Sequence, residues 1–278
     1  MTSNKTKDNF GNNKYLEYFK IGFKKSIEYK SYLIGALLTP LFMGIFFYYI
    51  WSYIFLVKGE GNPNFTIGGF TFEEMMVYLI IGLLLNTARS TEISDKISET
   101  IKSGDISIFL CRPVNFVKSL LADGIGGKVI NFFVFTILLI VMTNLFNLPY
   151  PKGSIFAIFL IYAILMILFD IILYVIVGGL SFWFVEIWGI KSSIEQILWI
   201  LSGRILPLSL FPEWMKMFLS FTPFLYLEYT FASIYLGKLT IVEALKAMGI
   251  FVFWIFLLAL LMKFVYKKGF KKLESFGG

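Results

Sequence analysis

The side chains that could carry chemistry are few in this sequence. Histidine is absent, and Cys111 is the single cysteine. Zinc hydrolases, Ser-His-Asp enzymes and histidine-ligated haem proteins all need an imidazole, while a thiolate metal cluster or an internal disulfide needs a second cysteine. The residue inventory therefore excludes these classes of catalytic and metal site.

A phosphate-binding loop is also missing from the sequence. No stretch has the pattern G-x-x-x-x-G-K-[ST], in which the final hydroxyl binds magnesium. Lys128 and Lys238, each preceded by a glycine, are followed by Val129 and Leu239, which carry no hydroxyl. We therefore expect no enzymatic activity and no cofactor in this chain. ATP and magnesium would bind to a separate subunit, and a chain without such an energy source would be a channel or carrier.

Two ionisable residues, Asp170 and Arg204, stand out in apolar surroundings. Asp170 lies near the middle of a predicted membrane span, where a charged side chain costs about 2.5–3.5 kcal/mol. It is therefore a candidate for the transport pathway, or else it forms a structural hydrogen bond to a neighbouring helix. Arg204 lies near the external end of another predicted span. We expect it to extend toward the headgroups, with contact to a substrate as the second interpretation.

The composition indicates that membrane helices position these residues. The chain has 278 residues, of which 58% are hydrophobic and only 15% are charged, and its mean hydropathy is +0.77. A soluble domain has about 45–50% apolar and about 25% charged residues. Six apolar runs approach the roughly 20 residues of a span, which predicts an all-α integral membrane protein with six transmembrane helices. The spans are expected near residues 32–57, 72–88, 116–145, 155–185, 194–210 and 242–266.

Lysine and arginine residues set the orientation of these spans. They are concentrated in the first thirty residues, in the loop after the second span and in the C-terminal tail. Cytoplasmic segments carry such an excess, so both termini and this loop are expected in the cytoplasm of a multi-pass protein of the cell membrane. The net charge of +7 then needs no nucleic-acid partner. The expected organisation is a cytoplasmic tail with an interfacial amphipathic helix (1–31), the six-helix domain (32–266) and a basic cytoplasmic tail (267–278).

The segment Pro212–Leu236 is apolar enough to suggest a seventh span. It contains Glu213, Lys216 and Glu228, which are costly at full membrane depth. A seventh crossing would also place the lysine-rich C-terminal tail outside the cell. We therefore interpret the segment as an external re-entrant hairpin before the last span.

The loop after the second span contains a short amphipathic helix. Ile93, Ile97 and Ile101 recur at intervals of four residues and form one apolar stripe. Gly104 follows as the expected C-cap. So short a helix needs a surface for its apolar stripe, either the membrane or a protein partner. Its acids and bases nearly balance, which favours a protein over anionic lipid; these residues are Glu92, Asp95, Lys96, Glu99 and Lys102.

The stretch Ile101–Pro113 reads I-K-S-G-D-I-S-I-F-L-C-R-P. It resembles the pattern I-x-S-G-D-h-S-x-x-L-x-R-P, where h is apolar, of the ABC-2 type permeases. These are the membrane subunits of ATP-driven exporters, and the resemblance is in particular to those grouped with drug and antibiotic export. Further similar pieces are Ser181–Gly189, Leu201–Pro212 and the terminal Gly277-Gly278 after a lysine-rich stretch. Together they cover nearly the whole chain in the right order.

The resemblance implies a permease that forms half of a transmembrane pathway and exports a hydrophobic or amphiphilic compound. Its partners would be a separate ATPase subunit, a second permease chain (a copy or a paralogue) and membrane lipid. The segment Glu92–Ser103 would be the coupling helix, with its isoleucine stripe buried in a groove of the ATPase subunit, and Lys14–Lys30 would be the interfacial helix. The residues implied in coupling are Glu92, Ile93, Asp95, Ile97, Glu99, Ile101, Gly104 and Asp105.

Two other classes of function stay open on the sequence. The first is an ion- or proton-coupled carrier that uses Asp170. The second is a membrane-embedded enzyme such as a lipid transferase, which is weakened because no span contains a D-x-x-D pair of carboxylates. The need for an ATPase subunit distinguishes the exporter from the carrier.

The charge distribution predicts that the C-terminal tail is cytoplasmic. We expect a cysteine in place of Ser275, in a chain whose Cys111 has been replaced, to resist an impermeant thiol reagent in intact cells and to react after the membrane is opened. Labelling of this cysteine in intact cells would contradict the predicted orientation.

Overall fold

The computed structural model describes residues 3–28, 30–60, 62, 64–87, 89–110, 114–145, 153–204 and 206–276. These residues are mostly helical and contain no β-strand, as the sequence predicted. The long helices are α1 (Ser3–Glu28), α2 (Lys30–Gly59), α6 (Phe116–Leu145), α7 (Gly153–Gly179) and α11 (Ile241–Phe276). The shorter helices are α3 (Phe72–Thr87), α4 (Thr91–Lys102), α5 (Ile106–Leu110), α8 (Trp188–Leu201), α9 (Glu213–Ser220) and α10 (Glu228–Tyr235). The 3-10 turns are η1 (Leu180–Phe182), η2 (Leu208–Leu210) and η3 (Pro223–Tyr226).

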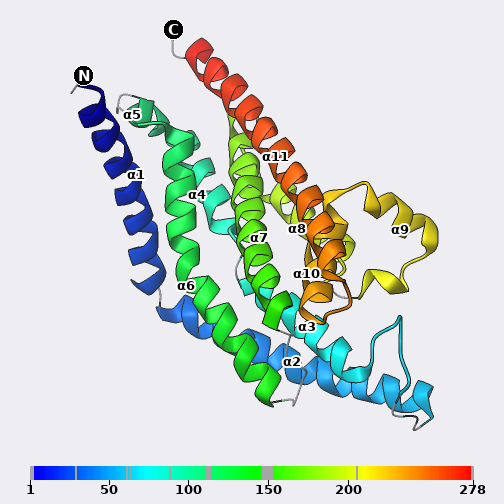
Figure 1. Cartoon of the computed structure of the whole chain (residues 1–278). Helices are drawn as coiled ribbons and strands as arrows, with labels where there is room; N and C mark the ends of the chain where they lie inside the picture. The colour runs from blue at the N-terminus through cyan, green and yellow to red at the C-terminus, as the bar shows by residue number, and fades with distance from the viewer. Residues whose placement is uncertain are drawn as a thin grey trace.

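The long helices define the shape of the molecule (Figure 1). The helices α6, α7 and α11 run along its long axis, α1 lies beside α6, and α2 passes obliquely across one end. The opposite end holds the beginning of α1, the short helix α5 and the end of α11. The segments predicted to be cytoplasmic therefore share one end of the molecule.

Four helices in the described part of the chain are long and apolar enough to cross a membrane. They comprise Leu38–Gly59, Phe116–Leu145, Ile155–Phe182 and Ile241–Leu273. The prediction of six spans is not confirmed. The helices α3 and α8 have 16 and 14 residues, which at about 1.5 Å per residue is shorter than the hydrocarbon core of about 30 Å.

The fifth predicted span differs from the helix that the structure shows. The sequence predicted one run over residues 194–210, whereas α8 begins at Trp188 and ends at Leu201. Gly203 has a φ of 84°, a left-handed conformation that cannot continue a helix. Pro207 then removes a backbone donor. The chain therefore turns where the sequence predicted continuous helix.

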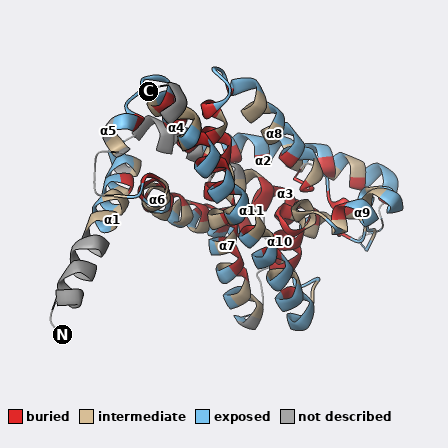
Figure 2. Cartoon of the chain, turned by 90° about the horizontal axis from the view of Figure 1, so that it is seen from above, coloured by how far each residue is buried: buried red, intermediate tan, exposed pale blue. Residues whose placement is uncertain are grey.

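The helix α3 forms the centre of the core, although it is short. Every side chain from Met75 to Ile81 is at most 2% exposed, as expected for a helix that is apolar on all sides. Its start is a capping box, in which the Thr71 N–H donates to Glu74 (2.9 Å) and the Glu74 N–H donates to the Thr71 hydroxyl (3.3 Å). Seen from above, buried residues surround α3, α10 and α7 (Figure 2). The second predicted span is thus a core helix of this fold.

The helix α1 packs along α6 instead of lying alone at the membrane surface. A Cβ on Gly22 would lie 2.0 Å from the carbonyl oxygen of Asp123, and one on Gly126 would lie 2.0 Å from that of Phe19. Only glycine permits backbones to approach this closely. The helix α1 therefore has a protein partner along the face that carries Gly22, and the interfacial role of Lys14–Lys30 stays a prediction.

Between α8 and α11 the described chain forms only short elements. Within the segment predicted as a re-entrant hairpin, α10 is buried, and the ring of Phe231 stacks on Phe159 of α7 at 4.3 Å. The helix α9 instead exposes Trp214, Met217 and Phe218. Each of these two helices has 8 residues, which is too short to span a membrane. Neither helix therefore forms a seventh transmembrane span.

We predict that Gly126→Ala separates α1 from α6, because the new methyl group meets backbone atoms that cannot move alone. Overpacking costs about 1–3 kcal/mol, and a chain of this size loses roughly 2–4 °C in Tm per kcal/mol. Thermal unfolding in detergent should show this loss. Gly249→Ala is the matched control, since nothing lies within 4 Å of its Cβ position. An unchanged Tm for Gly126→Ala would contradict the packing of α1 on α6.

Candidate functional site

The helix α4 forms where the sequence predicted the cytoplasmic helix. It runs from Thr91 to Lys102, one residue earlier at each end than predicted. The N–H of Ser103 bonds to the carbonyl of Glu99 at 2.9 Å. Gly104 follows with a φ of 78°, which confirms the predicted stop, because a left-handed glycine ends a helix without strain.

The isoleucine stripe of α4 is buried inside the chain itself. Ile97 is fully buried, and Ile93 and Ile101 are 7% and 9% exposed. A Cβ on Gly178 of α7 would lie 2.8 Å from the Cβ of Ile97, and one on Gly124 of α6 would lie 2.8 Å from Ile93. The prediction that this stripe lies in a groove of the ATPase subunit is therefore corrected. The stripe packs against α6 and α7, where small glycines leave room for it.

The charged face of α4 is ion-paired to three neighbouring elements. Two pairs reach α6, one reaches α8 and one reaches the turn between α7 and α8. The pairs are Glu92–Lys128 (2.8 Å), Asp95–Lys191 (2.7 Å), Lys96–Asp123 (2.5 Å) and Lys102–Glu186 (2.8 Å). Each pair has one exposed partner, although Lys128 itself is buried. Pairs open to water contribute only about 0–1 kcal/mol each, so we infer that these pairs set the orientation of α4 while the isoleucines supply most of its stability.

The remaining residues implied in coupling stay at the surface. Glu99 and Gly104 are exposed, as is Asp105, whose carboxylate accepts a hydrogen bond from the hydroxyl of Ser103 at 2.8 Å. The structure therefore divides the predicted coupling residues into two groups. The isoleucines face the bundle, and the polar residues face outward.

Asp170 on α7 holds the beginning of α4. Its carboxylate accepts the backbone N–H of Ser90 at 2.6 Å, and Ser90 is the N-cap residue of α4, whose own side chain makes no capping bond. A carboxylate at a helix N-terminus satisfies a free N–H and is favoured by the helix dipole. From α6, the ammonium of Lys128 donates to the carbonyl of Arg89. Of the two interpretations of Asp170, the structure shows the hydrogen bond to a neighbouring element.

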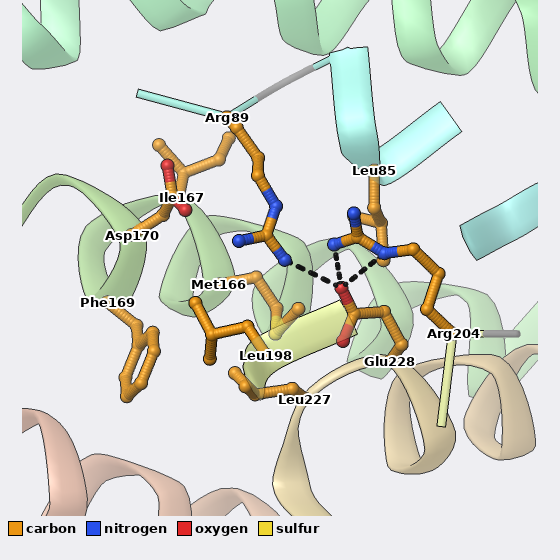
Figure 3. A pocket seen from close by; sticks show the side chains of 10 residues that line it. All are labelled: Leu85, Arg89, Met166, Ile167, Phe169, Asp170, Leu198, Arg204, Leu227 and Glu228. Carbon is orange, nitrogen blue, oxygen red and sulfur yellow. Dashed lines mark hydrogen bonds and ion pairs between the residues drawn. The ribbon is translucent and has the colours of Figure 1, made fainter. Parts of the chain in front are cut away.

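Beside Asp170, one carboxylate is shared by two guanidinium groups (Figure 3). Glu228 Oε1 accepts from Arg204 Nε at 3.1 Å, from Arg204 Nη2, and from Arg89 Nη2 at 3.3 Å. The three side chains are at most 12% exposed. Burial alone would raise the pKa of Glu228, but Arg204 and Arg89 lower it below its ordinary value. The carboxyl is therefore ionised at neutral pH.

This ion triad (Arg89, Arg204 and Glu228) joins distant parts of the chain. Arg89 precedes α4, Arg204 follows α8 and Glu228 begins α10. Arg204, which we expected to extend toward the headgroups, is thus corrected to a buried packing residue. The sequence analysis did not identify Arg89 or Glu228 as site residues. The sequence does contain one signal for this site: Glu228 lies in an apolar segment, and a buried carboxylate needs a cationic partner.

A small cavity lies between the triad and Asp170. Its volume is about 40 Å³, enough for one water molecule and far below the roughly 300 Å³ of a ligand pocket. The charged groups around it are Arg89, Arg204, Glu228 and Asp170, and Met166, Leu198 and Leu227 complete the wall (Figure 3). This arrangement is suited to holding helices together.

A larger cavity, of about 340 Å³, lies between α6 and α7. Its walls are almost entirely carbon, and they include four aromatic rings; these belong to Phe135, Phe156, Phe159 and Tyr235. An apolar cavity of about 150 Å³ is enough to bind benzene. This cavity can therefore hold a larger apolar group.

We predict that Glu228→Gln strongly destabilises the protein, because it removes the charged acceptor that two buried guanidinium groups share. Breaking a buried ion pair on one side costs about 3–5 kcal/mol, which lowers Tm by at least about 6 °C in a chain of this size. Glu213→Gln is the control, because the Glu213–Lys216 pair is exposed and contributes little. Equal unfolding temperatures for the two variants would contradict the triad.

Residues 38–277 match the family model of the ABC-2 family transporter protein. A comparison with curated proteins gives no match. The matched region begins within α2 and includes α4, the ion triad and both cavities. It also agrees with the resemblance that the sequence motifs indicated. The chain therefore belongs to the ABC-2 transporter family, and it is a membrane component of an ABC transport system that is not itself catalytic and whose family implies pairing with an ATPase subunit.

Proposed function

We propose that the chain is one of two permease subunits that together form the pathway of an ATP-driven exporter in the cell membrane. ATP and magnesium bind to the separate ATPase subunit, and α4 passes the motion of that subunit to the membrane helices. The second permease chain is a copy of this chain or a paralogue. The exported compound is hydrophobic or amphiphilic.

The position of α4 is the observation that carries this proposal. Ile97 packs directly on Gly178 of α7, and ion pairs connect α4 to α6 and α8. A movement of α4 therefore acts on three membrane-domain helices without passing through a flexible loop. Glu99 on α4 and Asp105 in the turn after it are exposed and are left for contact with another subunit.

The hydrogen bond of Asp170 supports this proposal over an ion- or proton-coupled carrier. A carrier needs a carboxyl that binds and releases its ion in each cycle. Asp170 instead accepts the N–H at the start of α4, a role that needs no proton transfer. An acid within a membrane helix is thereby explained, because its hydrogen bond holds the start of α4 in place.

The cavity between α6 and α7 supports the class of compound. Its aromatic and aliphatic walls favour an apolar group, and its volume of about 340 Å³ falls within the range of about 300–1,000 Å³ for ligand pockets. The cavity beside the ion triad is too small for such a compound. We therefore place the apolar part of the transported compound at the larger cavity.

The proposal is tested by purifying the tagged chain from membranes with its bound subunits. We expect a subunit with a phosphate-binding loop to copurify, to hydrolyse ATP, and to drive lipophilic fluorescent dyes across the membrane of reconstituted vesicles. ATP-independent transport that follows a proton or sodium gradient would support the carrier instead.

We predict that Ile97→Ala separates ATP hydrolysis from transport. Removing a buried isoleucine side chain costs about 2–5 kcal/mol, and here the loss falls on the contact between α4 and α7. The complex should still hydrolyse ATP, while dye transported per ATP hydrolysed falls several-fold. Ile137→Ala is the control, because Ile137 is 59% exposed on α6. Transport by Ile97→Ala equal to that of the control would exclude α4 as the coupling element.

A further inference from the structure

The last helix, α11, carries an apolar stripe that the described part of the chain leaves open. Phe253, Phe256, Leu260 and Phe264 recur every three or four residues, which places them on one side of the helix. Their side chains are 44–58% exposed. The opposite side of α11 packs on the bundle, where Phe251 is fully buried. The stripe is therefore a helix face that needs an apolar partner.

The same stripe ends in lysines. Lys267, Lys268 and Lys271 follow Phe264 by three, four and seven residues, so they continue its side of the helix. All three are exposed, and the Lys268 ammonium lies 5.8 Å from the centre of the Phe264 ring. The stripe thus changes from apolar to cationic within about one helical turn.

The length of the helix places this change at the edge of a bilayer. Between Lys246 and Lys267 lie 20 residues, of which only Lys263 is charged, and about 20 residues cross the hydrocarbon core. When Lys246 lies at one headgroup layer, Lys267 therefore reaches the other. The end of α11 shares its end of the molecule with the beginning of α1 (Figure 1), which is the end predicted to be cytoplasmic. The lysines are thus expected at the headgroups of the inner leaflet.

The three lysines are not neutralised by the described part of the chain. No carboxylate of these residues lies within 4 Å of their ammonium groups, whereas Lys96 and Lys102 of α4 are ion-paired. The part of α11 after Phe264 has four lysines and one glutamate, a net charge of +3. An anion is the partner that this end of the stripe lacks.

The packed side of α11 holds these lysines in place. The hydroxyl of Tyr266 donates to the carbonyl of Val175 on α7 at 3.0 Å. The ring of Phe182 packs edge-on against Tyr266 and Phe270, at centroid distances of 5.7 and 5.5 Å, and a Cβ on Gly269 would collide with the same ring. Because these contacts occupy the side of α11 opposite the lysines, the lysines extend from a fixed backbone, which reduces the entropy lost on binding.

The charge of the stripe distinguishes between a lipid and a second copy of this chain. In a two-fold contact the same residues meet each other, so a second copy would place three lysines against three lysines. An acidic phospholipid instead offers acyl chains to the apolar residues and a phosphate to the lysines, in the order in which the stripe presents them. Basic segments at the cytoplasmic end of a membrane helix attract such lipids. The stripe therefore matches a lipid better than a second copy.

We propose that this stripe of α11 is a binding site for an acidic phospholipid of the inner leaflet. The acyl chains lie along its four apolar residues, and its three lysines bind the phosphate of the headgroup. A ligand that binds the folded chain stabilises it by mass action, so this lipid also raises the stability of the membrane domain. The inference goes beyond the proposed function, since it depends on neither the ATPase subunit nor the transported compound.

Exposed lysines on and off the stripe provide a matched test. Binding of phosphatidylglycerol and of phosphatidylcholine to the full chain in neutral detergent is measured by native mass spectrometry. We expect the wild type to prefer phosphatidylglycerol, and Lys267→Gln with Lys271→Gln to weaken its binding at least about tenfold, because two of three cations are lost. Lys58→Gln with Lys246→Gln removes the same charge from other exposed positions and should leave binding unchanged. Lys267→Arg with Lys271→Arg should retain it.

Three outcomes would overturn the lipid site. The first is equal weakening by the two glutamine variants, or equal binding of the two lipids to the wild type. The second is displacement of phosphatidylglycerol by an equal concentration of inorganic phosphate, which would mean that the apolar residues take no part. The third is a disulfide between two copies in membranes through Phe264→Cys, in a chain whose Cys111 has been replaced. Because no ATPase subunit enters these measurements, each outcome leaves the proposed function standing.

Discussion

The carboxylate of Glu228 is the constraint on which the arrangement of this protein depends. It accepts hydrogen bonds from Arg204 and Arg89, which lie 24 and 139 residues before it in the chain. Desolvated ions are stable only when they are paired, so moving the segment of Glu228 would separate both buried guanidinium groups from the carboxylate that they share. Because Arg89 lies two residues before α4, the same triad also fixes where α4 begins.

The placement of α4 follows from three kinds of contact that agree with one another. Asp170 holds its first N–H, glycines on α6 and α7 admit its isoleucines, and lysines on α6 and α8 meet its acids. A helix of 12 residues is marginal in isolation. Here it packs on the long helices of the bundle, which suits the proposed role of α4 in transmitting motion.

The candidate site could be predicted in part from the sequence. The four-residue spacing of Ile93, Ile97 and Ile101 correctly indicated a buried helix face. Periodicity does not show, however, whether that face packs on the same chain, on another subunit or on lipid. Asp170 was recognisable as an ion that needs a partner, yet its partner is a backbone N–H, which every residue carries. Glu228 could not be matched with Arg89 and Arg204 because its partners lie 139 and 24 residues away.

The sequence by itself determined the helical membrane class, the family and the position of α4, because apolar run length, motif order and helix periodicity are local properties. Only the tertiary structure decided that α3 is a core helix, that α1 packs on α6 and that the isoleucine stripe faces inward. Each of these depends on a close approach between distant segments, such as Gly22 with Asp123 or Gly178 with Ile97. A glycine has the same appearance in a sequence whether or not another helix lies against it, so the contact exists only once the chain has folded.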